Sequence, residues 1–180
     1  MGGRLAGIET TVNGGAGLQH EPLPTTAIIG LGNPLRGDDG VGVCIAEILA
    51  ARPLPRDVQV IDGGTRGLGI VNLMEGWQRV ILVDAANVAE TPGQFLRFTL
   101  DEVDLLGGSS PLGGGQHLNV HYAGLREALL LAQALGSLPP EVVVFGVQPA
   151  STDWGSALSP EVQEALPDLI DAILGEVAVH

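Results

Sequence analysis

The run GLGNPLRGDDGVG, residues 30–42, constrains the fold more than any other part of the chain. It completes an apolar run at residues 27–31 that has the pattern of a buried strand, and it leads into apolar residues at helical spacing up to residue 49. A glycine turn at residues 32–34 separates the two segments. A strand, a tight turn and a helix in this order predict the first unit of an α/β fold, with chemistry at the carboxyl end of the strand.

The rest of the chain repeats this alternation. Apolar runs predict further strands, and helical patterns follow or precede them. The strands are expected at residues 58–61, 80–83, 94–99 and 142–145, and the helices at about 39–51, 68–75, 122–135 and 159–177. Residues 94–99 alternate polar and apolar side chains, which predicts a half-exposed edge strand. We therefore predict an α/β three-layer sandwich, in which helices cover both faces of a mostly parallel, twisted sheet of about five strands.

Two segments of different character divide the chain. Residues 1–25 are rich in Gly, Thr and Pro without a strand or helix period, which predicts a flexible N-terminal extension. Residues 26–180 are long enough and apolar enough to form a single domain with its own core.

Charge and cysteine content exclude several functional classes. The formal net charge is −13, with eight Arg and no Lys, which disfavours nucleic-acid and anionic-membrane partners and excludes a lysine nucleophile. The single Cys44 cannot form an internal disulfide and is predicted to be a small buried residue of a reducing compartment. Without a membrane-span or signal-peptide pattern, the expected location is the cytoplasm.

Acidic residues follow three of the predicted strands. Asp38 and Asp39 come after the first strand, Asp62 after the second and Asp84 after the third. Because the carboxyl ends of parallel strands meet at one edge of a sheet, these residues are candidates for a common site. Asp84 directly follows an apolar run, where an unpaired carboxylate is costly, so we expect it to have a partner or a metal.

Histidine narrows the search further, because the predicted domain holds only His117 and His121 before its last residue. His121 precedes an amphipathic helical pattern and is the favoured ligand, whereas His117 belongs to a glycine-rich loop. Asp39, Asp84 and His121 form a mixed oxygen and nitrogen set that suits a divalent transition metal and leaves coordination positions open.

Each candidate also has a purely structural interpretation. Asp38 can cap the following helix, and Asp39 can complement its dipole. Asp62 can make a turn hydrogen bond, Asp84 can be a satisfied buried acid, and His121 can lie on a helix surface.

Arg36 and Arg66 can be solvated surface charges or can bind a carboxylate of a partner.

The Gly30-Leu31-Gly32 sequence lacks the third glycine of a dinucleotide fingerprint, and no GxSxG, P-loop or HExxH motif occurs.

Four motifs taken together resemble the nickel-iron hydrogenase maturation proteases over roughly residues 26–174. They are GLGNPLRGDDGVG, DGGTRG at 62–67, VDAANV at 83–88 and FGVQP at 145–149. The resemblance implies a phosphorylase/hydrolase-like form of the predicted fold. It also implies that Asp39, Asp84 and His121 bind the metal.

The resemblance further implies a cytoplasmic, aspartic-type endopeptidase. Its partner would be the hydrogenase large-subunit precursor, from which it would remove a C-terminal extension after nickel insertion. The nickel would be recognised in the precursor, and no organic cofactor is expected. Asp39, Asp84 and Asp38 are the predicted catalytic residues, with Asp62 an alternative to Asp38. A carboxylate can activate water, or the metal can polarise the carbonyl, and both routes stay open.

Two other functions remain as alternatives. A non-cleaving chaperone could use the same ligands to check the precursor for nickel. Peptidyl-tRNA hydrolases also begin with a strand and GLGNP, but residues 36–39 of this chain depart from their next motif, and the charge of −13 suits tRNA poorly.

Overall fold

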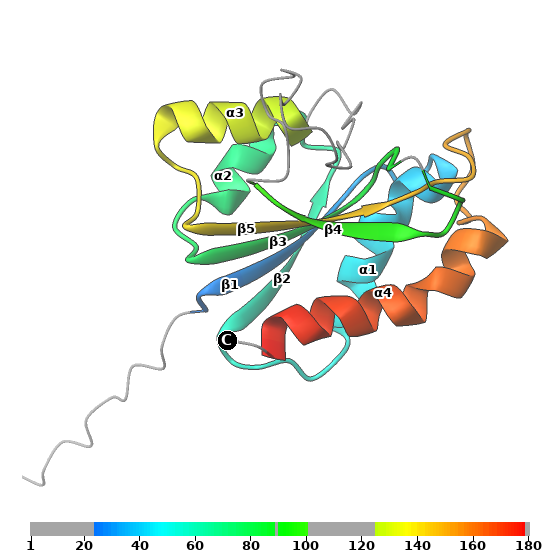
Figure 1. The fold of residues 1–180 in the computed structure, drawn as a ribbon, viewed down its shortest axis with the longest axis horizontal. Helices are drawn as coiled ribbons and strands as arrows, with labels where there is room; N and C mark the ends of the chain where they lie inside the picture. The colour runs from blue at the N-terminus through cyan, green and yellow to red at the C-terminus, as the bar shows by residue number, and fades with distance from the viewer. Residues whose placement is uncertain (1–23, 89, 101–124, 179–180) are drawn as a thin grey trace, which may run out of the picture.

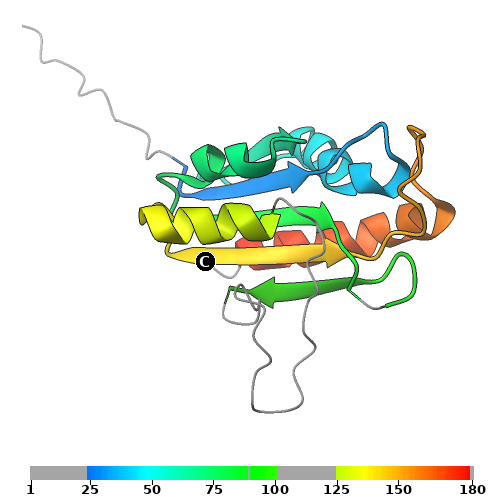
Figure 2. The same cartoon turned by 90° about the horizontal axis from the view of Figure 1, so that it is seen from above.

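The computed structural model describes residues 24–88, 90–100 and 125–178. Five strands form one sheet in the order β2-β1-β3-β5-β4 (Figure 1). The four parallel strands are β1 (Thr26–Leu31), β2 (Val58–Gly64), β3 (Arg79–Ala85) and β5 (Glu141–Val147). At one edge β4 (Phe95–Thr99) pairs antiparallel with β5, and Figure 2 shows its reversed direction. The mostly parallel sheet is confirmed, as is the edge position of β4, and β2 forms the opposite edge.

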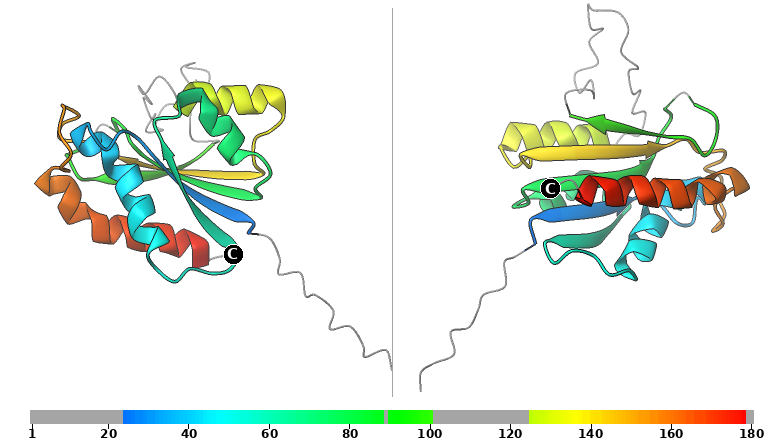
Figure 3. Two further views of the ribbon diagram at one scale, coloured as in Figure 1. Left: turned by 180° about the vertical axis from the view of Figure 1, so that it is seen from behind. Right: turned by 60° about the horizontal axis from the view of Figure 1, so that its bottom comes forward.

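Helices cover both faces of the sheet, which confirms the three-layer arrangement (Figures 1 and 3). One face carries α1 (Val41–Ala50) and α4 (Pro160–Ala178), and the other carries α2 (Ile70–Met74) and α3 (Leu125–Leu135). Two short 3-10 turns, η1 (Gly37–Gly40) and η2 (Gly67–Gly69), precede α1 and α2.

Alternate side chains of the buried strands fill two separate cores. In β1, Ile29 packs with Ile70 and Leu129 on the α2–α3 face, while Ile28 packs with Ile45 on the α1–α4 face. All of these side chains are almost completely buried. A strand that is buried on both faces requires an uninterrupted apolar run, which is why these strands could be recognised in the sequence.

Glycines bring the start of α1 against the sheet at backbone contact. A Cβ atom on Gly42 would lie 2.2 Å from the Val83 carbonyl oxygen and 2.4 Å from that of Leu31. Gly32 has a φ of +115°, and a Cβ there would lie 1.7 Å from the Asp39 carbonyl oxygen. The glycines of the 30–42 run therefore hold the acidic turn directly against the end of β1.

The C-terminal helix is tied to the sheet by ionic contacts. Buried Arg79 of β3 pairs with Glu176 of α4 and, at 2.9 Å, with Glu141. Arg97 of β4 also binds Glu176. Hydrogen bonds from Arg97 hold the pKa of Glu176 below its usual range. Each charge in this contact therefore has a partner.

Several element boundaries differ from the prediction. The helix expected from residue 39 begins as a 3-10 turn and becomes α-helical only at Val41. β2 extends to Gly64, so Asp62 lies within the strand and not after it, because β2 keeps pairing with β1 up to Gly64. Cys44 is half-buried, which makes the expectation of a buried residue wrong.

Some predictions fall on other parts of the chain. The extension at residues 1–25 lies almost entirely outside the described residues, and so do His117 and His121. No helix within the described ranges has the length and apolar character needed to span a bilayer.

Candidate active site

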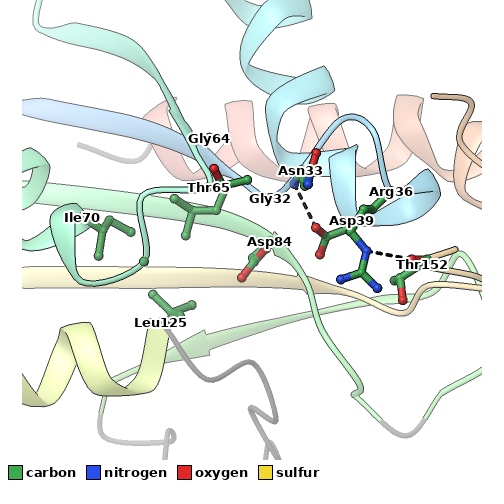
Figure 4. Close-up of a pocket in the computed structure, with 12 residues that line it drawn as sticks. Gly32, Asn33, Arg36, Asp39, Gly64, Thr65, Ile70, Asp84, Leu125 and Thr152 are labelled. Carbon is green, nitrogen blue, oxygen red and sulfur yellow. Dashed lines mark hydrogen bonds between the residues drawn. The ribbon is translucent and has the colours of Figure 1, made fainter. Parts of the chain in front are cut away.

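A pocket of about 330 Å³ lies at the carboxyl ends of β1, β2 and β3 (Figure 4). The chain passes from β1 to β2 on one side and later to β3 on the other, so the strand order reverses at this point, where open α/β sheets bind ligands. Residues from five segments line it: Leu31, Gly32, Asn33, Arg36, Asp39, Gly64, Thr65, Gly67, Ile70, Asp84, Leu125 and Thr152.

Asp39 reaches the pocket from the turn η1. Its carboxylate oxygen Oδ2 accepts a hydrogen bond from the backbone N–H of Asn33 at 2.9 Å, which fixes the side chain across the turn. Only 9% of the residue is exposed. This hydrogen bond links the glycine turn to the acidic turn and fixes the position of the carboxylate.

Asp84 enters the same pocket from the end of β3 and is 7% exposed. Burial, together with the nearby negative charge of Asp39, raises the pKa of Asp84 from 3.8 to about 7, although a hydrogen bond from the Ala85 backbone lowers it. Figure 4 shows both carboxyl groups directed into the same hollow. At pH 7 about half of the Asp84 carboxyl groups therefore carry a proton.

A pair of this kind favours a cation. A divalent ion between the carboxyl groups would displace the proton of Asp84 and offset the repulsion from Asp39. Among the residues that the structure describes, no group of three or more His, Cys, Asp or Glu side chains is placed to hold a metal ion. The predicted third ligand, His121, lies outside those residues, so the prediction that it completes the site stays a prediction.

Asp38 points away from the pocket despite its position beside Asp39. Its buried carboxylate accepts backbone N–H bonds from Ser159 at 2.6 Å, Ala150 at 2.8 Å and Ser151 at 3.2 Å. Burial alone would raise the pKa of Asp38, but these hydrogen bonds outweigh it and lower the pKa below 3.8. Asp38 therefore fixes the connection between β5 and α4, a role different from the predicted catalytic one, and it does not cap α1.

Asp62 is exposed and accepts a hydrogen bond from the Gly64 backbone at 2.9 Å, the local turn contact that its sequence context predicts. It does not line the pocket, and neither does Arg66. Arg36 does line it, with its Nε donating to the Thr152 carbonyl at 3.1 Å. Sequence reasoning missed Thr152, because no pattern links residue 152 to the first strand.

Comparisons with known proteins agree on one family. The family model described as hydrogenase maturation protease matches residues 43–176. The hydrogenase expression/formation protein HupD of Bradyrhizobium diazoefficiens is 34% identical over 146 residues, covering 80% of this chain and 73% of that protein. The hydrogenase 2 maturation protease of Escherichia coli is 28% identical over 149 residues, which cover 82% of this chain and 87% of that protein.

Solved structures give the same result. The hydrogenase maturating endopeptidase HybD of E. coli aligns with a TM-score of 0.70 at 27% identity, over 85% of this chain and 91% of that one. The nickel-iron hydrogenase maturation protease HycI of Thermococcus kodakarensis aligns with a TM-score of 0.62 at 26% identity, over 82% of this chain and 88% of that one.

Proposed function

This chain belongs to the hydrogenase maturation protease family and is a peptidase, and from that premise we propose that it removes the C-terminal extension of a nickel-iron hydrogenase large-subunit precursor. The observation that carries the proposal is the pairing of Asp39 and Asp84 in one pocket at the carboxyl ends of β1 and β3. The family resemblance recognised in the sequence is confirmed.

In this proposal, the carboxylate pair recognises nickel that is already bound in the precursor. The Asn33 backbone fixes the carboxylate of Asp39, and Asp84 would exchange its proton for the ion. His121 is the proposed third ligand. Because the nickel belongs to the substrate, its binding also fixes which peptide bond lies in the pocket.

Peptide-bond cleavage then requires an activated water or a polarised carbonyl. A carboxylate of the pair can act as a general base and accept the proton of an attacking water; the pKa of about 7 belongs to Asp84 without a metal, and a bound nickel ion would lower it. Polarisation of the scissile carbonyl by the substrate's nickel is the second route. In either case Asp38 acts by holding the β5–α4 connection, since its carboxylate is occupied by three backbone N–H groups.

The family assignment does not favour a peptidyl-tRNA hydrolase activity. A non-cleaving chaperone would use the same pocket but leave the precursor intact, so a change in precursor mass separates it from the protease. We further propose that the protein acts in the cytoplasm, without a nucleic-acid or membrane partner.

The test is cleavage of a nickel-loaded precursor by the wild type and by Asp39→Asn, Asp84→Asn and His121→Ala variants. Each variant removes a proposed ligand, and we expect each to lower the initial rate by about a hundredfold or more. The readout is the intact mass of the precursor over time. Melting curves of the variants show whether each one is folded.

Asp62→Asn is the matched control, because Asn can keep the turn hydrogen bond to Gly64 while the carboxylate is removed. We expect wild-type cleavage by this variant. Full activity of both Asp39→Asn and Asp84→Asn would contradict the proposed site, whereas an unchanged precursor with the wild type would contradict the proposed protease activity.

A further inference from the structure

Two loops that are distant in sequence form one rigid ribbon at the rim of the pocket. Residues 35–37 follow β1 and residues 151–155 follow β5, and we call them together the rim ribbon. Gly155 N–H donates to the Leu35 carbonyl at 2.9 Å, and Gly37 N–H donates to the Gly155 carbonyl at 2.6 Å. These bonds form a parallel bridge between Arg36 and Gly155.

The buried Asp38 anchors the rim ribbon through hydrogen bonds. Its backbone N–H donates to the Ser151 carbonyl at 3.1 Å, and its carboxylate binds the N–H groups of Ala150 and Ser151. A buried carboxylate with several amide donors is a strong anchor. The ribbon is therefore a preformed surface, which lowers the entropic cost of binding a partner.

The ribbon presents apolar side chains to solvent beside the pocket. Trp154 is 79% exposed and Leu35 is 59% exposed. The guanidinium of Arg36 lies 6.0 Å from the centroid of the Trp154 ring, and the same residue lines the pocket. Trp and Arg are the residues most often found at the energetic centre of protein interfaces.

A third exposed apolar side chain lies beside another part of the pocket lining. Leu68 is 53% exposed and belongs to η2, directly after the pocket-lining Gly67. In the described part of the chain, three of the five exposed large apolar residues thus adjoin the pocket, and the other two, Leu131 and Leu135, lie on α3. Exposed apolar groups that gather at one place mark an interaction site.

We propose that the rim ribbon and Leu68 are the docking surface for the folded body of the hydrogenase large-subunit precursor. The proposal rests on the proposed function. A peptide bond that reaches the pocket brings its parent protein against the rim, and a pocket of about 330 Å³ is too small to take up more than a short segment of it. The precursor surface would present an apolar group to Trp154 and an acidic group to Arg36.

The test is the steady-state cleavage of the nickel-loaded precursor by Leu35→Ser, Trp154→Ser and Trp154→Phe variants of the full chain. Loss of a docking contact weakens binding of substrate and transition state equally, so KM should rise about tenfold for Trp154→Ser while kcat changes little. Trp154→Phe keeps an aromatic ring and should recover most of this loss. Leu135→Ser is the matched control, because Leu135 is 65% exposed at the far end of α3, and it should behave as the wild type.

Equal KM values for the wild type, Leu35→Ser and Trp154→Ser would overturn the inference. So would a dimer in sedimentation that dissociates on Trp154→Ser, because a second copy of the chain would then occupy the surface. Calorimetric titration of the precursor into each variant tests docking without cleavage. If the wild type binds the precursor but does not cleave it, the proposed function fails, and the precursor affinities of the wild type and the variants still test the docking surface. If the wild type does not bind the precursor, the docking inference is overturned.

Discussion

Burial changes the acid–base behaviour of Asp84, and this has a consequence for stability. The folded protein holds its proton up to a pKa of about 7, whereas an unfolded chain releases it near 3.8. Between these values the folded state binds more protons than the unfolded state, so stability falls as pH rises through this window, by roughly 1.4 kcal/mol per unit. Above about pH 7 the loss is complete and stability no longer depends on this group.

We therefore expect Asp84→Asn to be more stable than the wild type at pH 7.5 and to lose this advantage on acidification towards about pH 4. Thermal unfolding of both proteins across this range measures the difference. Asp39→Asn gives a second check. This variant lacks the charge that helps to raise the pKa of Asp84, so its stability should stop falling at a lower pH than that of the wild type, and should fall by a smaller total amount. A stability difference that does not vary with pH would contradict the account of Asp84.

The structural roles of some of these aspartates could be predicted from the sequence, and those of others could not. Asp62 makes its hydrogen bond two residues away, so its turn role could be predicted from the Gly-Gly that follows it. Asp84 follows an apolar strand, and this position predicted a buried acid in need of a partner. The partners of Asp38 lie 112 to 121 residues further along the chain, and no local pattern could distinguish this role from helix capping or catalysis.

At the scale of elements, the contact between α1 and the sheet depends on Gly42. A methyl group there would meet backbone atoms of β1 and β3, which cannot move aside without disturbing both strands. We expect Gly42→Ala to lower the free energy of unfolding by at least about 3 kcal/mol, measured by urea denaturation.

Gly175→Ala is the matched control for this prediction. Gly175 lies within α4, and a Cβ atom there meets nothing within 4 Å. Alanine should raise the stability by about 0.5 to 1 kcal/mol, because glycine is the poorer helix former. Equal effects of the two substitutions would contradict the close approach of α1 to the sheet.

Element types were predictable where one physical requirement dominates. Parallel strands buried on both faces need continuous apolar runs, and each of these runs appears in the sequence. The boundaries were less accurate, because tertiary pairing determines them. β2 extends through Asp62 and the two glycines because β1 continues to pair with it, although the local sequence resembles a turn.

At the scale of the whole molecule, the strand order produces the site. β1 and β3 are neighbours although β2 separates them in the sequence, and their parallel direction brings Asp39 and Asp84 to the same edge. The predicted parallel sheet was sufficient to expect that these two residues lie close together, because the carboxyl ends of parallel strands share one edge of the sheet. The rim ribbon was not predictable, since it joins loops more than a hundred residues apart through backbone hydrogen bonds.

The most direct test of the account is the intact mass of one hydrogenase large-subunit precursor, incubated with this protein in nickel-loaded and nickel-free forms. If the carboxylate pair recognises the substrate's nickel, only the loaded precursor should lose its C-terminal peptide. Equal cleavage of both forms would contradict nickel recognition by Asp39 and Asp84, and cleavage of neither form would contradict the proposed protease function.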